Sequence, residues 1–253
     1  MKISKIEWTE ASWNPTIGCD KVSSGCKNCY AEVMAKRLQA MGNMDYKDGF
    51  KFKMLPHRLN EPKQNKKPTL YFVNSMSDLF HEKMDFNFLD SILKVIKETP
   101  QHKYQILTKR PQRMRKYFLK NEIPKNVWLG TTIESNKVKS RIDLIRDLDA
   151  SVKWISCEPL ISDLGELDLS GIDWVITGGE SGVNARPMKE EWVLNIKKQA
   201  EQHFIPFFFK QWGTWSKDGI RGNKKKNGKL LQGEIIQQMP EMLREDFLNT
   251  GKD

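Results

Sequence analysis

The chain has 253 residues, with 42 Lys and Arg against 32 Asp and Glu, which gives a formal charge of +10 and a pI of about 9.3. This length can bury one large core or two smaller ones, and the basic surplus favours polyanionic partners such as nucleic acid, with a solvated basic surface as the alternative. The sequence has neither an apolar run of about 18 residues nor the apolar segment of a signal peptide. We therefore expect no membrane partner and a location in the cytoplasm.

Helix and strand signals alternate along most of the chain. A first helix is predicted within residues 29–42, where apolar side chains recur every three to four residues. Short apolar runs rich in β-branched and aromatic residues predict buried parallel strands at 69–74, 103–108, 126–132, 152–157, 173–178 and 205–210. Further helices are predicted at 86–98, 111–121, 136–149 and 190–202, whereas the connection 158–172 is less clearly helical.

These elements predict an α/β fold. With a short strand at 16–19, before a cysteine-rich loop, the count reaches about seven β-α units, which indicates a complete or partial TIM-like (β/α) barrel. A doubly wound open sheet is the alternative. We expect the barrel to span 1–212, with a polar insertion at about 42–68. A basic hairpin and tail at 213–253 would pack on it, with Asn227-Gly228 at or near the hairpin turn.

Polar residues follow most of the predicted strands, at the ends where β-α barrels carry their chemistry. In chain order they are Asn74, Ser75, Ser77 and Asp78; Thr108, Lys109 and Arg110; Thr132, Glu134 and Asn136; Cys157 and Glu158; Gly178, Gly179, Glu180 and Ser181; and Lys210 and Gln211. Each residue has an ordinary structural role open to it, such as helix capping. Their coincidence over six strands favours one shared pocket.

Three of the four cysteines, Cys19, Cys26 and Cys29, lie in one short loop with the spacing C-x6-C-x2-C. Four cysteines in a chain of this length do not indicate a disulfide framework. A structural zinc site normally has four ligands, and Cys157 could supply the fourth. The alternative is a [4Fe–4S] cluster held by three thiolates, which leaves one iron free for a cofactor or substrate.

The cysteine loop and several further motifs resemble a known group of proteins. A cysteine triplet after the first strand of a TIM-like barrel is typical of radical S-adenosylmethionine (radical SAM) enzymes. The ordered set IEWTEASWNPTIGCDKVSSGCKNCYAE, FVNSMSDLFH, LTKRP, SCEPL, ITGGESG and FFFKQWG resembles a phage- and prophage-associated radical-SAM-like family, mostly described as being of unknown function. The loop departs from the common radical SAM spacing C-x3-C-x2-C, and Asn28 stands where an aromatic residue is usual.

The resemblance implies a barrel of the radical SAM type in which Cys19, Cys26 and Cys29 bind a [4Fe–4S] cluster and SAM binds its open iron. Electrons would come from an external donor such as flavodoxin or ferredoxin, in the host cytoplasm if the gene is of phage origin. Cleavage of SAM would yield a radical that abstracts hydrogen from the substrate. The residues that we assign to binding the cofactor are Tyr30 (for adenine), Asn74, Ser75, Ser77, Asp78, Thr132, Glu134, Gly178 and Gly179.

Other strand-end residues are assigned to the substrate. The catalytic candidates are Lys109, Cys157, Glu158, Glu180 and Lys210, and the substrate-binding candidates are Arg110, Arg186 and Gln211. Two readings stay open for Arg186, which could bind a phosphate or pair with Glu180. Cys157 could donate a hydrogen atom or serve as a spare ligand, but the favoured reading is a small buried strand residue. The favoured substrate is a nucleotide or a base in nucleic acid, such as a modified base of phage DNA. The alternative function is a non-catalytic nucleic-acid-binding protein with a structural zinc or iron–sulfur site.

Overall fold

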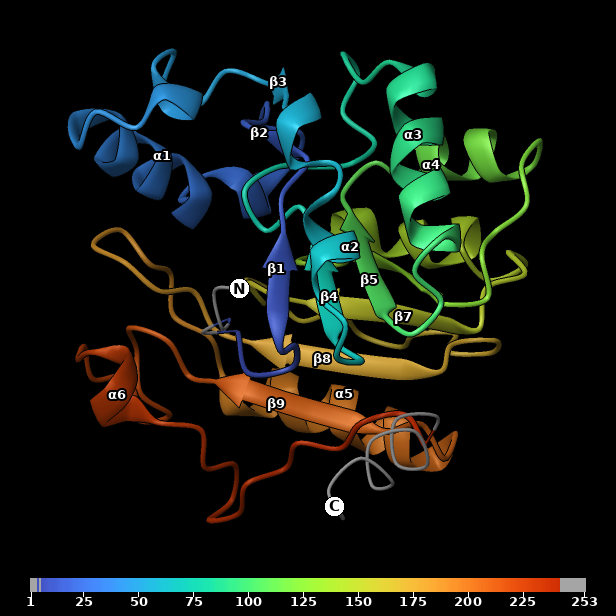
Figure 1. Cartoon of the computed structure of the whole chain (residues 1–253). Helices are drawn as coiled ribbons and strands as arrows, with labels where there is room; N and C mark the ends of the chain where they lie inside the picture. The colour runs from blue at the N-terminus through green and yellow to red at the C-terminus, as the bar shows by residue number, and fades with distance from the viewer. Residues whose placement is uncertain (1–3, 5, 242–253) are drawn as a thin grey trace, which may run out of the picture. The chain divides into compact units, whose positions relative to one another are not determined.

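The computed structural model describes residues 4 and 6–241 of the chain, which fall into two compact units. The first unit comprises the described residues up to Thr131 together with Leu148–Ser151. The second comprises Thr132–Asp147 and the described residues from Val152 onward. In both units parallel strands alternate with helices or loops (Figure 1), so the predicted parallel β/α organisation is confirmed. The predicted domain boundary at residue 212 stays a prediction.

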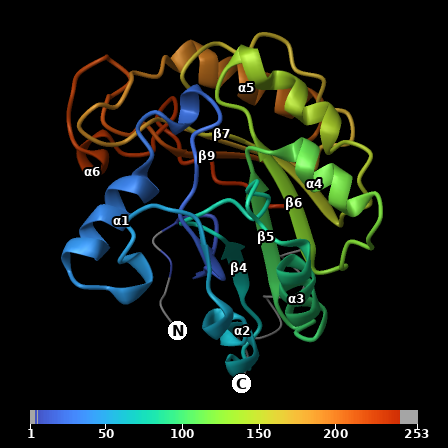
Figure 2. The same cartoon turned by 90° about the horizontal axis from the view of Figure 1, so that it is seen from above.

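The sheet of the first unit is parallel and buried. Its strands are, in sheet order, β1 (Ala11–Trp13), β4 (Leu70–Val73), β5 (Lys103–Thr108) and β6 (Val127–Thr132). Every residue of β4 and β6 is buried, which explains why these strands are continuous apolar runs without alternation. The connecting helices α3 (Phe86–Lys97) and α4 (Pro111–Phe118) lie on the same face of this sheet (Figure 2).

The predicted first strand is formed, but in a different sheet. β2 (Thr16–Ile17) pairs antiparallel with β3 (Lys53–Met54), which belongs to the segment predicted as a polar insertion. The parallel sheet instead begins with β1, whose register with β4 places Trp13 opposite Val73. The expectation that residues 16–19 begin the parallel sheet is therefore wrong, and the short β2–β3 sheet is an addition to the β/α pattern.

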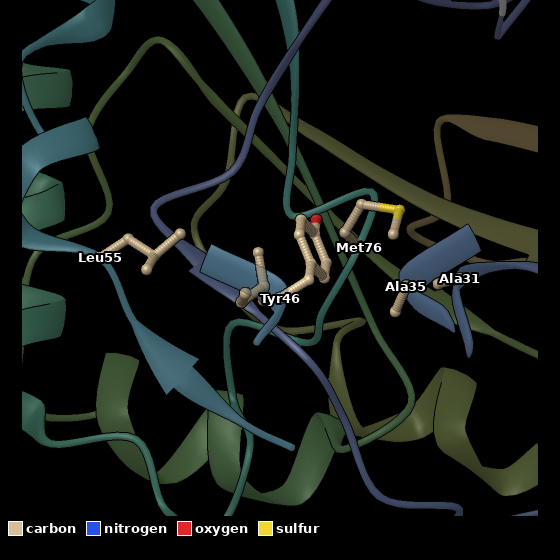
Figure 3. Packing of buried hydrophobic residues seen from close by; sticks show 6 residues of the cluster. Ala31, Ala35, Tyr46, Leu55 and Met76 are labelled. Carbon is tan, nitrogen blue, oxygen red and sulfur yellow. The ribbon is translucent and has the colours of Figure 1, made fainter. Parts of the chain in front are cut away.

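The insertion has a core of its own. It contains β3, the short helix α2 (Glu61–Gln64) and two 3-10 turns, Met44–Tyr46 and Pro56–Arg58. Its side chains Tyr46 and Leu55 are buried in a cluster with Ala31 and Ala35 of helix α1 (Tyr30–Ala40) and with Met76 (Figure 3). This cluster, which also contains Ile17, packs α1 against the insertion and the segment after β4, so that residues on both sides of the cysteine loop are buried in it.

The second unit has a parallel sheet in the order β7 (Val152–Cys157), β8 (Trp174–Gly178) and β9 (Phe207–Gln211). Helix α5 (Glu190–Gln202) connects β8 to β9 within the predicted bounds and buries Val193, Ile196 and Ala200 at helical spacing. The segment predicted as a helix at 136–149 is a 3-10 helix over Asn136–Leu144.

The predicted C-terminal hairpin has a different turn. Asn227 is the last residue of a short helix, α6 (Lys224–Asn227), and Gly228 follows with a φ of +68°. Reversals of the chain occur on either side, where Trp215 pairs with Arg221 and Leu231 with Glu234. The predicted hairpin turn at Asn227-Gly228 is therefore wrong, and part of the tail lies outside the described residues. Among the residues described, no helix is both long enough and apolar enough to cross a membrane.

Candidate functional site

The cysteine loop is attached to the end of β4. Gly18 begins the loop with a φ of +74°, and a Cβ at this position would lie 2.1 Å from the backbone oxygen of Lys51, so a glycine is needed here. Its N–H donates to the Met76 carbonyl at 3.0 Å. Its carbonyl accepts a hydrogen bond from the Ser77 hydroxyl at 2.7 Å. Both backbone polar groups of Gly18 are therefore hydrogen-bonded, which fixes the backbone directly before Cys19.

The three cysteines of the loop are free thiols of intermediate burial. Cys26 is the last residue of a 3-10 turn that begins at Ser24, and Cys29 directly precedes α1. Within the described part of the chain, no group of three His, Cys, Asp or Glu side chains is placed to hold a single metal ion. A cluster makes a different demand, because each thiolate binds its own iron. The donor set of this loop fits a cluster in both number and chemistry.

Arg110 connects the end of β5 to the cysteine loop. Its Nη1 lies 3.5 Å from Cys19 Sγ and 3.1 Å from Asp78 Oδ2, and its Nη2 donates to the Asp20 carbonyl at 3.1 Å. The side chain is only 5% exposed. A buried guanidinium beside a thiol favours the thiolate form, because the opposite charges attract strongly away from water.

Asp78 holds this guanidinium in place. Its carboxylate accepts hydrogen bonds from Phe80 N (2.9 Å), Thr108 Oγ1 (2.7 Å), Lys109 N (3.1 Å) and Arg110 Nη1 (3.1 Å). A carboxylate offers about four acceptor sites, so these protein donors fill it. Asp78 thus positions Arg110, whereas its assignment to the ammonium of SAM stays a prediction.

Titratable groups beside the loop are shifted by burial. Burial, with the Asp78 carboxylate adding to it, raises the pKa of Cys19 to about 11, and Arg110 acts in the opposite direction. Burial and the nearby Arg110 charge lower the pKa of His81. The Nδ1 of His81 accepts from Lys83 N at 3.1 Å, so its Nε2 carries the proton that faces Asp20 Oδ2 at 3.1 Å. No role was predicted for His81, and its place in the motif FVNSMSDLFH was the available signal.

Other residues predicted to bind SAM bond to one another or to the chain just before the loop. The Tyr30 hydroxyl donates to the Ser75 carbonyl, while the Tyr30 residue stays 58% exposed. The Ser75 hydroxyl donates to Asn14 Oδ1 at 3.2 Å. Asn74 has a left-handed φ of 63°, and its Oδ1 accepts from Thr16 N at 3.3 Å. The Asn74 Nδ2 is buried and has no acceptor among the described residues, which leaves a donor for a ligand.

In the second unit, the ends of β7 and β9 are joined by an ion pair. Lys210 Nζ lies 2.7 Å and 2.9 Å from the two oxygens of Glu158, and both side chains are largely buried. A Cβ added to Gly178, at the end of β8, would lie 3.4 Å from each of these two side chains. The structure therefore brings together two predicted catalytic residues, in a form where each neutralises the other.

A second ion pair follows β8. Arg186 donates to Glu180 from its backbone N (2.8 Å), its Nε (2.9 Å) and its Nη2 (2.6 Å). The alternative reading of Arg186, a pairing with Glu180, is confirmed. This hydrogen-bonded carboxylate raises the pKa of Arg186. The backbone carbonyl of Glu180 in turn accepts from Thr214 N at 3.0 Å, which attaches the chain after β9 to this loop.

Gly179 has a structural reason to be glycine. A Cβ at this position would lie 1.9 Å from the Trp212 carbonyl oxygen, and the Gly179 N–H donates to the Gln211 carbonyl at 2.9 Å. The backbone after β9 thus lies directly against Gly179, and the assignment of this residue to the cofactor stays a prediction. Gln211 is 5% exposed, and its side-chain Oε1 has no donor among the described residues.

The remaining strand-end residues of the second unit are deeply buried. Glu134 is fully buried and pairs with Arg141 at 3.0 Å, and Arg141 also donates to the Thr132 carbonyl at 2.9 Å. Arg141 was not predicted as a partner of Glu134, because a pairing across seven residues in a 3-10 segment has no recognisable spacing in the sequence. Cys157 is fully buried; burial, reinforced by Glu134, raises its pKa to about 12. These contacts favour the reading of Cys157 as a core residue of β7.

Comparison with known proteins places the chain in a family. The family described as "Protein of unknown function (DUF5131)" matches residues 3–240. The chain belongs to the DUF5131 family. No curated protein sequence matches this DUF5131 chain.

Solved structures of spore photoproduct lyase are similar to this DUF5131 chain in fold. A cysteine-to-serine mutant of that enzyme gives a TM-score of 0.50 at 12% identity, with 79% of this chain and 63% of that chain covered. Its complex with dinucleoside spore photoproduct gives 0.49 at 11% identity with the same coverage. The first comparison shows an α/β fold similar to the radical SAM fold of spore photoproduct lyase. The DUF5131 chain spans 63% of the length of those structures.

The predicted site residues thus fall into two sets. The first unit brings the cysteine loop together with Tyr30, Asn74, Ser75, Ser77, Asp78, Lys109 and Arg110. The second unit contains Thr132, Glu134, Cys157, Glu158, Gly178, Gly179, Glu180, Arg186, Lys210 and Gln211. A single pocket shared by both sets stays a prediction for this DUF5131 chain.

Proposed function

We propose that this protein is a radical SAM enzyme that holds a [4Fe–4S] cluster on Cys19, Cys26 and Cys29. The observation that carries the proposal is the loop itself, with three free thiols on one short segment attached to the ends of two parallel strands. The similarity of the fold to a radical SAM fold supports it. Three thiolates leave one iron of such a cluster open, and that iron is the proposed place of SAM.

The residues of the loop region would bind and orient the cofactors. When bound, the cluster and SAM supply one-electron cleavage of the sulfonium and abstraction of hydrogen from the substrate. Arg110 favours the thiolate of Cys19, and Asp78 keeps Arg110 in position. The exposed ring of Tyr30 offers a face for adenine, and the unused Nδ2 donor of Asn74 suits a carboxylate or ribose oxygen.

We propose a nucleotide, or a base within nucleic acid, as the substrate. The support is the formal charge of +10 and the presence, in the second unit, of Lys210 in β9 and Arg186 in the loop after β8. Each cation is paired with a carboxylate, so a substrate phosphate would compete with Glu158 or Glu180 for it. The buried Oε1 of Gln211 is an acceptor suited to a base N–H.

The cellular setting belongs to the same proposal. All four cysteines are free, which suits the reducing cytoplasm that a thiolate-bound cluster needs. A flavodoxin or ferredoxin is the proposed electron donor. The phage association and a modified base of phage DNA as the target are the finer parts of this proposal, and they rest on the sequence resemblance.

The test is anaerobic reconstitution of the full chain with iron and sulfide, followed by iron analysis and a visible spectrum. We expect about four irons per chain and a brown protein. On addition of SAM and dithionite, 5′-deoxyadenosine should accumulate. Single variants Cys19→Ala, Cys26→Ala and Cys29→Ala should each lose the cluster and the product.

The matched control is Cys157→Ala, the same substitution at the remaining cysteine. It should keep the iron content of the wild type, because Cys157 is buried in the core of the second unit. Loss of iron in this variant, or a colourless zinc protein in the wild type, would instead indicate a four-cysteine structural site. A stable cluster with no 5′-deoxyadenosine would refute SAM cleavage.

A further inference from the structure

A strongly basic segment follows the last strand of the second unit. Residues 215–229, called here the basic segment, contain six cations and one acid (Lys217, Arg221, Lys224, Lys225, Lys226 and Lys229 against Asp218). The local surplus of five charges is half of the +10 carried by the entire chain. The three consecutive lysines of α6 are all exposed. The polyanion-binding character that we infer from composition is thus concentrated in one stretch.

The backbone of the basic segment is held by hydrogen bonds. Trp215 and Arg221 form an antiparallel bridge, and Ser216 N donates to the Ile220 carbonyl at 2.9 Å across the turn. Asn223 then caps α6, because its Oδ1 accepts from Lys226 N at 2.9 Å. The cations are therefore presented on a folded backbone, which lowers the entropy lost when they bind a partner.

The basic segment is attached to the loop that follows β8. Trp215 Nε1 donates to the Ala185 carbonyl at 2.7 Å, and the Arg221 guanidinium donates to the Val183 carbonyl. The Arg221 guanidinium also lies 6.0 Å from the centre of the Trp215 ring, within reach of a cation–π contact. The loop that these bonds reach is the one that pairs Arg186 with Glu180. The basic surface therefore borders the strand-end residues proposed to contact the substrate.

The partner chemistry follows from the shape and charge of this surface. Membrane-surface binding uses an amphipathic helix with a continuous apolar face, whereas α6 has only four residues, three of them lysines. The exposed apolar side chains nearby, Val183, Ile220 and Leu230, are single residues at separate positions in the chain. Exposed cations on a short folded stretch suit a chain of phosphates, whose bound counterions are released on contact.

We propose that the basic segment binds the phosphate backbone of a nucleic acid and so delivers a nucleotide to the strand ends of the second unit. The inference rests on the nucleic-acid part of the proposed function. It concerns binding alone, so its test does not depend on whether the protein cleaves SAM. Because phosphates carry no base identity, the basic segment gives affinity and register, and the choice of base is left to the strand-end residues.

The test is a fluorescence-anisotropy titration of labelled oligonucleotides with the full, reconstituted chain at several salt concentrations. Single-stranded DNA, duplex DNA and RNA form separate arms, with a mononucleotide and phosphatidylserine vesicles as further arms. The variant K224Q/K225Q/K226Q should bind the preferred oligonucleotide on the order of tenfold more weakly, with a salt slope lower by about 2 for a single strand. The charge-preserving variant K224R/K225R/K226R should bind like the wild type.

The matched control is K47Q/K66Q/K67Q, which removes the same charge from exposed lysines of the first unit. Normal binding by this control supports the inference, whereas equal weakening in both glutamine variants would reduce it to an effect of net charge and overturn it. Binding of the wild type to the vesicles would also overturn it, and so would failure of the wild type to bind any of the oligonucleotides. Measuring 5′-deoxyadenosine without nucleic acid in the same preparations separates the two proposals, since SAM cleavage can fail while the binding pattern holds.

Discussion

The two units use the polar ends of their strands in different ways. In the first unit, Ser77 and Arg110 hold a separate loop by hydrogen bonds to its backbone and to Cys19, and Asp78 keeps Arg110 in position. In the second unit, the carboxylates of Glu158 and Glu180 are closed into ion pairs with neighbouring cations. Strand ends of the same parallel β/α topology therefore support a loop in one unit and form ion pairs in the other. The chemistry of each unit is decided by its side chains and not by its topology.

The largest effect is expected when the Asp78 carboxylate, which holds Arg110 beside the cysteine loop, is removed. Asp78→Ala should lower the free energy of unfolding by about 3–5 kcal/mol, because it leaves the guanidinium of Arg110 buried without its partner. It should also lower the iron bound on reconstitution, since Arg110 would no longer be held beside Cys19. Chemical denaturation and iron analysis of the same preparation measure the two effects.

The control for this prediction is Glu82→Ala, which removes a second carboxylate near the same Arg110. Glu82 is 71% exposed and lies 3.9 Å from Arg110 Nε, so its loss should cost less than about 1 kcal/mol and leave the iron content unchanged. Equal losses in the free energy of unfolding for the two variants would show that Asp78 does not hold Arg110. The first unit would then not differ from the second in the way described above.

The strands and helices that sequence analysis placed correctly have local signals. The buried strand β5 and helix α5 occupy the predicted positions because an apolar run or a helical repeat is contained within each of them. β1 was missed, since it has three residues and pairs with β4 nearly 60 residues later, and no local pattern records such a pairing. β2 was found but misassigned for the same reason, as its partner β3 lies in a polar segment.

The candidate site, like the fold, could be predicted only in part. The cysteine spacing and the polar strand ends are visible in the sequence, so the candidate residues could be named. Their partners could not, because Ser77 bonds Gly18 and Arg110 reaches Cys19 across 59 and 91 residues. Asn227-Gly228 illustrates a local signal that tertiary contacts overrode: the Asn227 side chain donates to the Gly213 carbonyl at 3.0 Å and ends a helix instead of forming a turn.

An intermediate effect is expected at Gly179 in the second unit. Gly179→Ala should destabilise the protein by about 1–3 kcal/mol, since the new methyl group would overlap the Trp212 carbonyl and push the chain after β9 away. Gly178→Ala is the control, because its nearest neighbours would lie at 3.4 Å, an ordinary contact distance. Thermal unfolding distinguishes them. Unchanged stability of Gly179→Ala, with weaker SAM binding, would return Gly179 to the cofactor role first predicted for it.

The smallest effect is expected for the pair Glu158–Lys210. Its variants, set beside those of Asp78 and Arg110, test directly whether the polar strand ends of the two units differ in role. Lys210→Met alone should cost about 1 kcal/mol, less than Asp78→Ala, because the Glu158 side chain is 19% exposed and keeps more contact with water than the 5% exposed Arg110. The double variant E158Q/K210M should recover most of that loss. The corresponding double variant D78N/R110M should likewise recover stability relative to Asp78→Ala. It should still bind less iron, since the donor beside Cys19 is gone. Normal iron content in D78N/R110M would mean that both units merely pair their charges, and that the polar strand ends of the first unit do not support the cysteine loop.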